Sequence, residues 1–146
     1  MNVSDLRYAK RELRQNDLNL VIVKKGKILF ETRSPGIGGF LLTIENVGTE
    51  LVGSSVADRI VGRAAAFLCT YAEIASVFAV TISAEGLEVL RKNVIHYEYK
   101  QLVPHILNSA QTAICPFEEL TSGLTDPKEA YLKLKNEVGY LKSKGS

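Results

Sequence analysis

The sequence has four histidine and cysteine side chains, the types that most often bind zinc: Cys69, His96, His105 and Cys115. The stretch His96-Tyr97-Glu98 matches a His-x-Glu pattern, in which histidine binds zinc and glutamate shuttles protons to and from an attacking water. It stands in a predicted strand, where His96 and Glu98 share one face, and no pair of cysteines follows it. We therefore interpret it as strand surface, and His105 as a structural or surface histidine.

The two cysteines differ in their setting. Cys115 precedes Pro116, and proline suits the first position of a helix, so Cys115 is predicted to stand at a helix start. A thiol there can be nucleophilic, although an unreactive buried thiol is the more common case. Cys69 lies in an apolar helical stretch and is predicted to belong to the core. Without a secretion signal, two free thiols indicate a reducing compartment, so we expect a cytoplasmic protein.

Composition limits the class of protein. Apolar residues make up 46% and charged residues 23% of the 146 residues, which is ordinary for one globular domain spanning residues 1–146. The net charge is +2, which gives no reason to expect a nucleic-acid partner. No run of about eighteen apolar residues occurs, so no membrane span is expected.

The spacing of apolar residues in the first half predicts a helix, a hairpin and two further helices. Ser4 caps the first helix, whose apolar positions are Leu6, Ala9 and Leu13. Residues 18–24 and 27–32 are two predicted strands, joined at Lys25-Gly26 by a tight turn. A short helix is predicted at 40–46, and a longer one at 56–71 because apolar residues recur there at three- and four-residue steps.

The second half alternates more clearly. A buried strand is predicted at 76–83, and Ser83 caps a helix that runs to about Lys92. A further strand is predicted at 94–99. Residues 101–125 give no clear pattern apart from the helix start at Cys115. An amphipathic helix follows at 126–142. Strands that alternate with helices after an initial hairpin indicate an α/β fold with a mixed sheet and helices on both faces.

Four segments resemble DUF1893, a small prokaryotic family without a settled activity: 58–66, 82–85, 102–108 and 114–118. The resemblance extends over a core of roughly residues 18–120, flanked by the N-terminal helix and the C-terminal amphipathic helix. The family is similar in fold to the cytidine deaminase superfamily. This implies a three-layer α/β/α domain with a mixed sheet of about five strands that begins with the antiparallel hairpin.

The resemblance also indicates where a deaminase would bind zinc. The first motif falls near Val61-Gly62-Arg63, where Val61 cannot bind a metal and Arg63 cannot serve as the shuttling acid. The second falls near Cys115-Pro116, which supplies one thiol and reverses the usual Pro-Cys order. One ligand of three remains. We therefore predict no zinc-dependent deaminase chemistry, no metal site and no cofactor.

In a deaminase-like fold the pocket lies at the N-terminal ends of the two helices that normally carry these motifs. Helix starts present free N–H groups and a partial positive charge, which suit anions. By the resemblance, Ser54, Ser55 and Asp58 surround the first start, Arg63 lies one turn further on, and Cys115 is at the second. These five residues are the ligand-binding candidates. Asp58 and Cys115 are also the catalytic candidates, although an acid in a first helical turn also stabilises the helix by itself.

We therefore expect a metal-free protein that binds a nucleoside, a nucleotide or a related small molecule, a ligand class that follows from the resemblance alone. One alternative is an enzyme of another type that uses Asp58 and Cys115. Another is a subunit that acts only through protein contacts. A homo-oligomer is expected by analogy with the superfamily.

Overall fold

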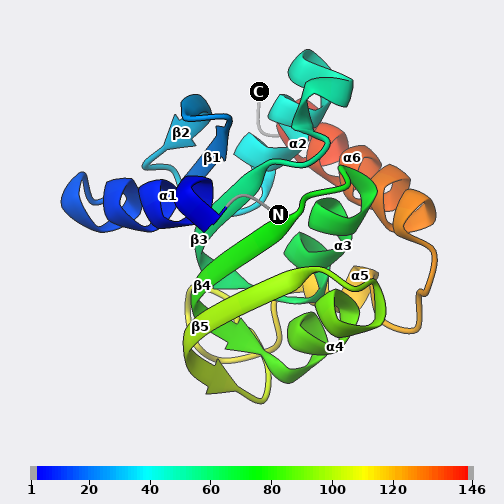
Figure 1. The fold of residues 1–146 in the computed structure, drawn as a ribbon. Helices are drawn as coiled ribbons and strands as arrows, with labels where there is room; N and C mark the ends of the chain where they lie inside the picture. Colours follow the sequence, from blue (N-terminus) through cyan, green and yellow to red (C-terminus); the bar gives the residue numbers. More distant parts are fainter. Residues whose placement is uncertain (1–2, 145–146) are drawn as a thin grey trace.

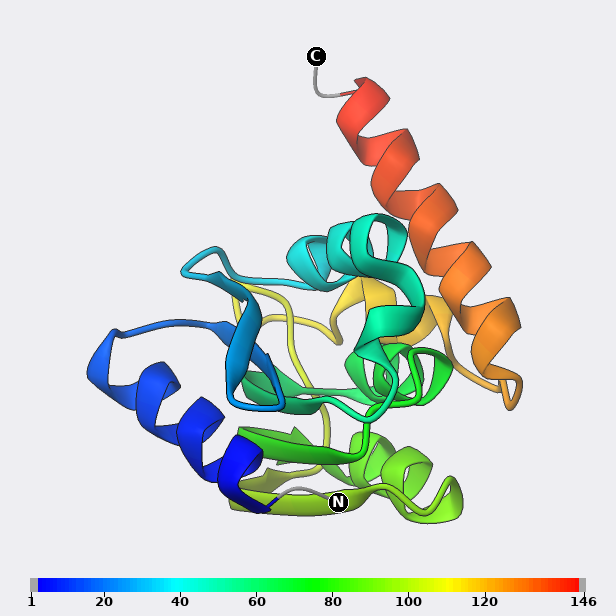
Figure 2. The same cartoon turned by 45° about the horizontal axis from the view of Figure 1, so that its top comes forward.

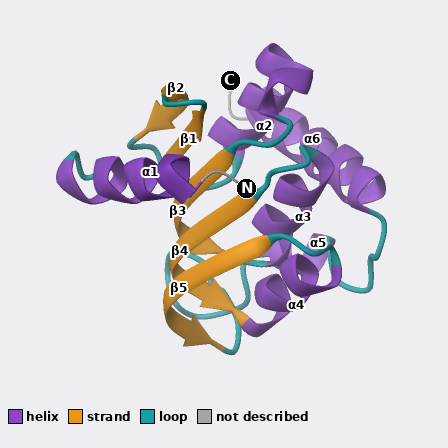
Figure 3. Ribbon diagram, in the orientation of Figure 1, coloured by secondary structure: helices purple, strands orange, loops and turns teal. Residues whose placement is uncertain are grey.

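The computed structural model describes residues 3–144, with side chains described through residue 139. Its centre is a mixed five-stranded sheet with the order β2-β1-β3-β4-β5. Strand β1 is antiparallel to both neighbours, whereas β3, β4 and β5 are parallel (Figure 3). The strands are β1 Leu20–Lys24, β2 Lys27–Thr32, β3 Ser55–Val61, β4 Ser76–Ser83 and β5 His96–Val103. This is the predicted sheet of about five strands that begins with a hairpin.

Helices cover both faces of the sheet, which gives the three predicted layers (Figures 1 and 2). Helix α1 packs on one face, where it buries Leu6, Ala9 and Leu13. The other helices pack on the opposite face around the larger hydrophobic core. The helices are α1 Val3–Gln15, α2 Gly38–Val47, the short 3-10 helix η1 Gly48–Leu51, α3 Arg63–Tyr71, α4 Ala84–Lys92, α5 Pro116–Leu120 and α6 Pro127–Lys144.

The hairpin turn is the one that the sequence predicts, and α1 holds it in place. Lys25 and Gly26 both have positive φ angles, 50° and 77°, as the tight turn between two paired strands requires. The backbone N–H groups of Lys25 and Gly26 each donate a hydrogen bond of 2.8 Å to the carboxylate of Asp5, which is buried. Helix α1 is therefore fixed to the sheet by a polar clamp as well as by its apolar face.

The prediction of one helix over 56–71 is wrong, because its first half is the central strand β3. Strand β3 pairs with β1 on one side and β4 on the other, and Gly62 then separates it from α3. The apolar residues at helical spacing are real, but this half is rich in β-branched residues and both of its edges find strand partners. Tertiary pairing therefore overrides a local helical pattern.

Later elements agree better with their predictions. Strand β4 has the predicted bounds, and the hydroxyl of Ser83 caps α4 by accepting a hydrogen bond of 3.0 Å from the Gly86 N–H. Helix α5 starts after Cys115 as predicted. Strand β5 begins at His96 and extends to Val103, into a stretch whose pattern is unclear. The predicted terminal helix is α6, which packs on α3 through the stacked rings of Tyr71 and Tyr131, 4.3 Å apart.

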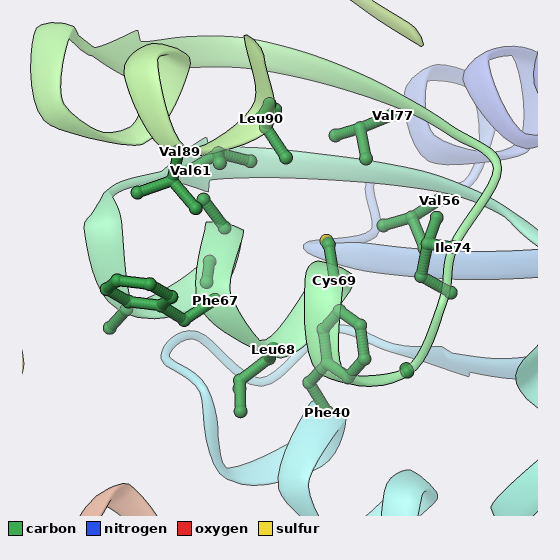
Figure 4. Packing of buried hydrophobic residues seen from close by; sticks show 14 of the residues in the cluster. Phe40, Val56, Val61, Phe67, Leu68, Cys69, Ile74, Val77, Val89 and Leu90 are labelled. Atoms are coloured by element: carbon green, nitrogen blue, oxygen red, sulfur yellow. The ribbon is translucent and has the colours of Figure 1, made fainter. Parts of the chain in front are cut away.

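Helix α3 lies at the centre of the larger core. Its side chains Phe67, Leu68 and Cys69 are all buried, and Figure 4 shows Cys69 directed toward the sheet near Val56. The prediction that Cys69 belongs to the core is therefore confirmed. Because α3 starts directly after β3, the position of its first residues is set by the sheet beneath and by the helices packed around it.

Candidate functional site

The structure moves three of the five predicted ligand-binding residues away from a helix start. Asp58 and Ser55 lie within β3, and Ser54 directly precedes it, so the first turn of α3 begins several residues later at Arg63. Ser54 and Ser55 have no exposed surface, and the Ser55 hydroxyl is 2.8 Å from that of Ser76 in the neighbouring strand. Their predicted position beside a helix start is therefore wrong, because that prediction placed the helix over the strand.

The N-terminus of α3 is occupied by a carboxylate of the protein itself. Glu118 of α5 is buried, and its side chain accepts hydrogen bonds from the backbone N–H groups of Arg63 at 2.6 Å and Ala64 at 2.8 Å. The guanidinium of Arg63 in turn donates to the Glu118 carbonyl oxygen at 3.0 Å. Burial raises the pKa of Glu118 above its ordinary value, while the two N–H groups oppose that rise. An anionic ligand would have to displace Glu118 to reach these N–H groups.

The start of α4 lies directly against the start of α3. A Cβ atom added to Gly86 would stand 2.9 Å from the carbonyl oxygen of Gly62, so only glycine allows this approach. Glu85, the neighbour of Gly86, is 2.6 Å through its Oε1 from Nδ1 of His105, in the segment after β5. The charges of Arg63 and Glu85 both influence the pKa of Glu118. We call Arg63, Glu85, His105 and Glu118 the helix-start cluster.

Two buried polar atoms of the helix-start cluster have no hydrogen-bond partner among the described residues. They are Nε of Arg63, a donor, and Oε2 of Glu85, an acceptor. Nearly all buried polar atoms in folded proteins are paired, because an unpaired one costs free energy. A donor and an acceptor are therefore left over at two adjoining helix starts.

Asp58 is the second unusual carboxyl. Burial raises its pKa to about 7 from an ordinary value of 3.8, and the backbone N–H groups of Ile60 and Arg59 oppose that rise. The contact from the Ile60 N–H is long, at 3.4 Å. Asp58 also raises the pKa of the Cys69 thiol in α3, second to the effect of burial, so this carboxyl faces α3. Near neutral pH it is present in both protonation states, as acid–base chemistry requires.

Cys115 stands where the sequence places it, at the start of α5, and its thiol is free and partly buried. Helix α5 has five residues, so its dipole is small. The Cys115 carbonyl oxygen accepts a hydrogen bond of 2.9 Å from the Glu118 N–H, which places Cys115 beside the helix-start cluster. No hydrogen bond connects Cys115 with Asp58 within residues 3–144.

Three cluster residues, Glu85, His105 and Glu118, are absent from the sequence-based candidates. Their partners are 20 to 55 positions away along the chain, and no local pattern reports such contacts. The signal that was available is Gly62, a glycine at a strand-to-helix junction, which indicates close approach of another group. Among the described residues, no three His, Cys, Asp or Glu side chains are placed to hold a metal ion. No helix in that part of the chain is long and apolar enough to cross a membrane.

Comparison with family models gives a match over residues 8–138 to the "Domain of unknown function (DUF1893)". The chain belongs to the DUF1893 family. A crystal structure of a DUF1893 protein from Thermotoga maritima is similar to it with a TM-score of 0.85 and 26% identity, covering 94% of this chain and 92% of that one. The resemblance seen in the sequence is therefore confirmed. No curated protein matches the chain.

Solved deaminase structures are more distant from this DUF1893 chain. A dCMP deaminase from cyanophage S-TIM5 has a TM-score of 0.47 and 12% identity over 70% of this chain and all of that one. RibD from Acinetobacter baumannii has a TM-score of 0.47 and 18% identity over 66% of this chain and 33% of that one. The mixed five-stranded sheet of this chain agrees with the predicted α/β fold class, and the family is one of unknown function.

Proposed function

We propose that the protein binds a nucleoside, a nucleotide or a related small molecule at the helix-start cluster. The observation that carries this proposal is the pair of unpartnered buried atoms, Nε of Arg63 and Oε2 of Glu85. The cluster lies where β3 and β4 end, and in sheets with parallel strands ligands bind outside the carboxyl ends of the strands.

The chemistry of the two atoms favours a nucleobase. A guanidinium N–H and a carboxylate oxygen together complement an edge on which a carbonyl oxygen stands next to an N–H or amino group. Uracil and guanine carry such edges, with a carbonyl oxygen beside a ring N–H. His105 adds a third group at the exposed side of the cluster, because its Nδ1 contacts Glu85 and its Nε2 remains directed elsewhere. The cluster is less suited to bind the phosphate of a nucleotide, since Glu118 already accepts hydrogen bonds from the N–H groups at the start of α3.

Of the five sequence-based candidates, Arg63 keeps a direct binding role in this proposal, and Cys115 is a neighbour of the site. Asp58 is a further candidate through its partly buried carboxyl. Ser54 and Ser55 act through the packing of β3, because they stand at the end of that strand opposite to the helix-start cluster.

The test is calorimetry with a panel of the four common ribonucleosides and their 5′-monophosphates, with mass spectrometry of any molecule that co-purifies. Glu85→Gln replaces the free acceptor by an amide, and we expect it to weaken binding by about tenfold or more. Glu88→Gln, one turn further along α4 and exposed, is the matched control and should change binding little. If no member of the panel binds, or if both variants bind like the parent, the proposal is wrong.

A second candidate function, acid–base catalysis by Asp58, is favoured by the pKa near 7 of that carboxyl. A nucleoside that binds the protein would then be converted, at a rate that changes around pH 7. We would follow products by mass spectrometry in the parent and in Asp58→Asn, which should lose both the conversion and its pH dependence. A bound nucleoside that is recovered unchanged after long incubation with the parent would leave binding as the function.

A further inference from the structure

A cavity of about 500 Å³ lies on the face of the sheet that α1 covers, opposite to α3 and α4. It is an open groove between α1 and strands β3, β4 and β5, lined by residues from all four elements and by Asp17, which follows α1. Figure 1 shows α1 beside β1 and β3, on the side of the sheet away from α3 and α4. We call it the α1–β5 groove. Its volume lies within the range of about 300–1,000 Å³ that is usual for small-molecule sites.

The groove carries an excess of positive charge. Both of its acids are already paired: Glu98 with Lys10 at 3.0 Å, and Asp17 with Arg59 at 2.6 Å. The side chains of Arg14 and Lys100 line the same groove and form no hydrogen bond or ion pair within the described part of the chain. Two cations thus remain uncompensated.

Helix geometry explains why Arg14 lies between the two ion pairs. Lys10 and Arg14 are four residues apart on α1, so they share one face of the helix, and Asp17 lies just beyond the end of α1. The ion pairs connect this face to β5 at one end and to β3 at the other. The Asp5 clamp and the buried face of α1 hold the helix in this position. Arg14 is therefore presented to the groove by a fixed element.

The floor of the groove is apolar. It is made by Leu13 of α1 with Phe78 and Val80 of β4, and the ammonium of Lys10 lies 4.8 Å from the centre of the Phe78 ring. Ligand sites typically combine such an apolar lining with a few charged groups that fix orientation. The apolar floor suits the organic part of a small molecule, and the two unpaired cations, Arg14 and Lys100, suit an anionic group.

We propose that the α1–β5 groove binds a small phosphorylated molecule, with its phosphate at Arg14 and Lys100 and its organic part on the partly buried Val80. Arginine pairs with phosphate through two parallel N–H donors, and lysine adds a compact point charge. This site is independent of the helix-start cluster, because it shares no residue with it and lies on the other face of the sheet.

The test uses ADP as the probe, with adenosine as the uncharged comparison, followed by NMR of the 15N-labelled protein. We expect ADP to shift amide signals of α1 and β5, and adenosine to leave these signals in place. In the double variant Arg14→Gln, Lys100→Gln, we expect ADP to bind at least about tenfold more weakly at this site. The control Lys128→Gln, Lys133→Gln removes the same charge from exposed positions of α6 and should bind within about twofold of the parent.

Each outcome distinguishes the two sites. Signal changes confined to the starts of α3 and α4 would support the helix-start cluster and reject the α1–β5 groove. Equal weakening in both double variants would also reject the groove, since it would indicate general charge attraction alone. Shifts at α1 and β5 that persist in Glu85→Gln but are lost in Arg14→Gln, Lys100→Gln would establish the groove even where the helix-start proposal fails. Thermal unfolding of each variant confirms that it is folded.

Discussion

Arg63 and Glu118 contact each other in both directions. The Arg63 backbone N–H donates to the Glu118 carboxylate at 2.6 Å, and the Arg63 guanidinium donates to the Glu118 carbonyl oxygen at 3.0 Å. This reciprocal pair connects α5 to the start of α3. The N-terminus of a helix is usually capped by a side chain that directly precedes it in the sequence, whereas here Glu118 of the five-residue helix α5 is the cap. The start of α3 is thereby neutralised before any ligand arrives.

Glu118→Ala should lower the free energy of unfolding by about 2 kcal/mol, because it leaves two N–H groups of α3 without an acceptor. Urea unfolding measures this difference. Glu119→Ala is the matched control, since Glu119 is exposed and adjacent in the sequence, and it should change stability by less than about 0.5 kcal/mol. Equal losses in the two variants would show that Glu118 does not act as a cap.

Gly62→Ala should lower the free energy of unfolding as much as Glu118→Ala does, since the added Cβ atom would overlap the Glu118 carboxylate. The φ angle of Gly62 is −100°, which any residue adopts, so the effect is steric and not a matter of backbone strain. We expect a loss of about 2 kcal/mol, measured by urea unfolding. Gly38→Ala, where nothing lies within 4 Å of the added atom, is the control.

The double variant Gly62→Ala, Glu118→Ala separates the overlap from other effects. With the carboxylate removed, the added methyl group has room, so the double variant should lose clearly less stability than the two single losses added together. Simple additivity would mean that Gly62 and Glu118 act independently.

Sequence patterns predict this fold well where structure is local. The turn at Lys25-Gly26, the cap at Ser83 and the helix start at Cys115 depend on neighbouring residues, and all three predictions are confirmed. The prediction for β3 is wrong because the two strands that pair with it, β1 and β4, are remote in sequence, and residues 55–61 contain no local pattern that indicates this pairing. The prediction of the site residues is incomplete for the same reason, since the residues that surround the start of α3 come from α4, α5 and the segment after β5.

Ser55→Ala should lower the free energy of unfolding by about 1–2 kcal/mol, because it leaves the buried Ser76 hydroxyl without a partner. Ser54→Ala is a close control. Its hydroxyl is equally buried but has no partner among the described residues, so its removal should cost almost nothing or stabilise the protein. Chemical unfolding of both variants decides between a structural role for Ser55 and none, and neither change should affect nucleoside binding.

Asp58 should make the protein less stable as the pH rises from about 4 to about 7. Its pKa is 3.8 in the unfolded chain and about 7 in the folded one, so across this window the folded state holds the extra proton. The unfolded state therefore gains relative to the folded state as protons are removed, and the slope of stability against pH is negative. Asp58→Asn, which stays neutral, should be more stable than the parent at pH 8 by on the order of 2 kcal/mol. Curves for parent and variant that run parallel between pH 4 and 8 would contradict this.

Cys115 should react with iodoacetamide well before Cys69 in the native protein. Cys69 is 1% exposed, and burial together with the charge of Asp58 raises the pKa of its thiol, so it holds little of the reactive thiolate. Cys115 is partly exposed. Mass spectrometry of peptides after timed labelling gives both rates, and labelling in urea supplies the rate of an unprotected thiol.

If native Cys115 reacts faster than that unprotected rate, its surroundings activate it and the enzyme hypothesis gains a nucleophile. If it reacts more slowly, Cys115 is an ordinary thiol that borders the helix-start cluster, and acid–base chemistry would rest on Asp58 alone.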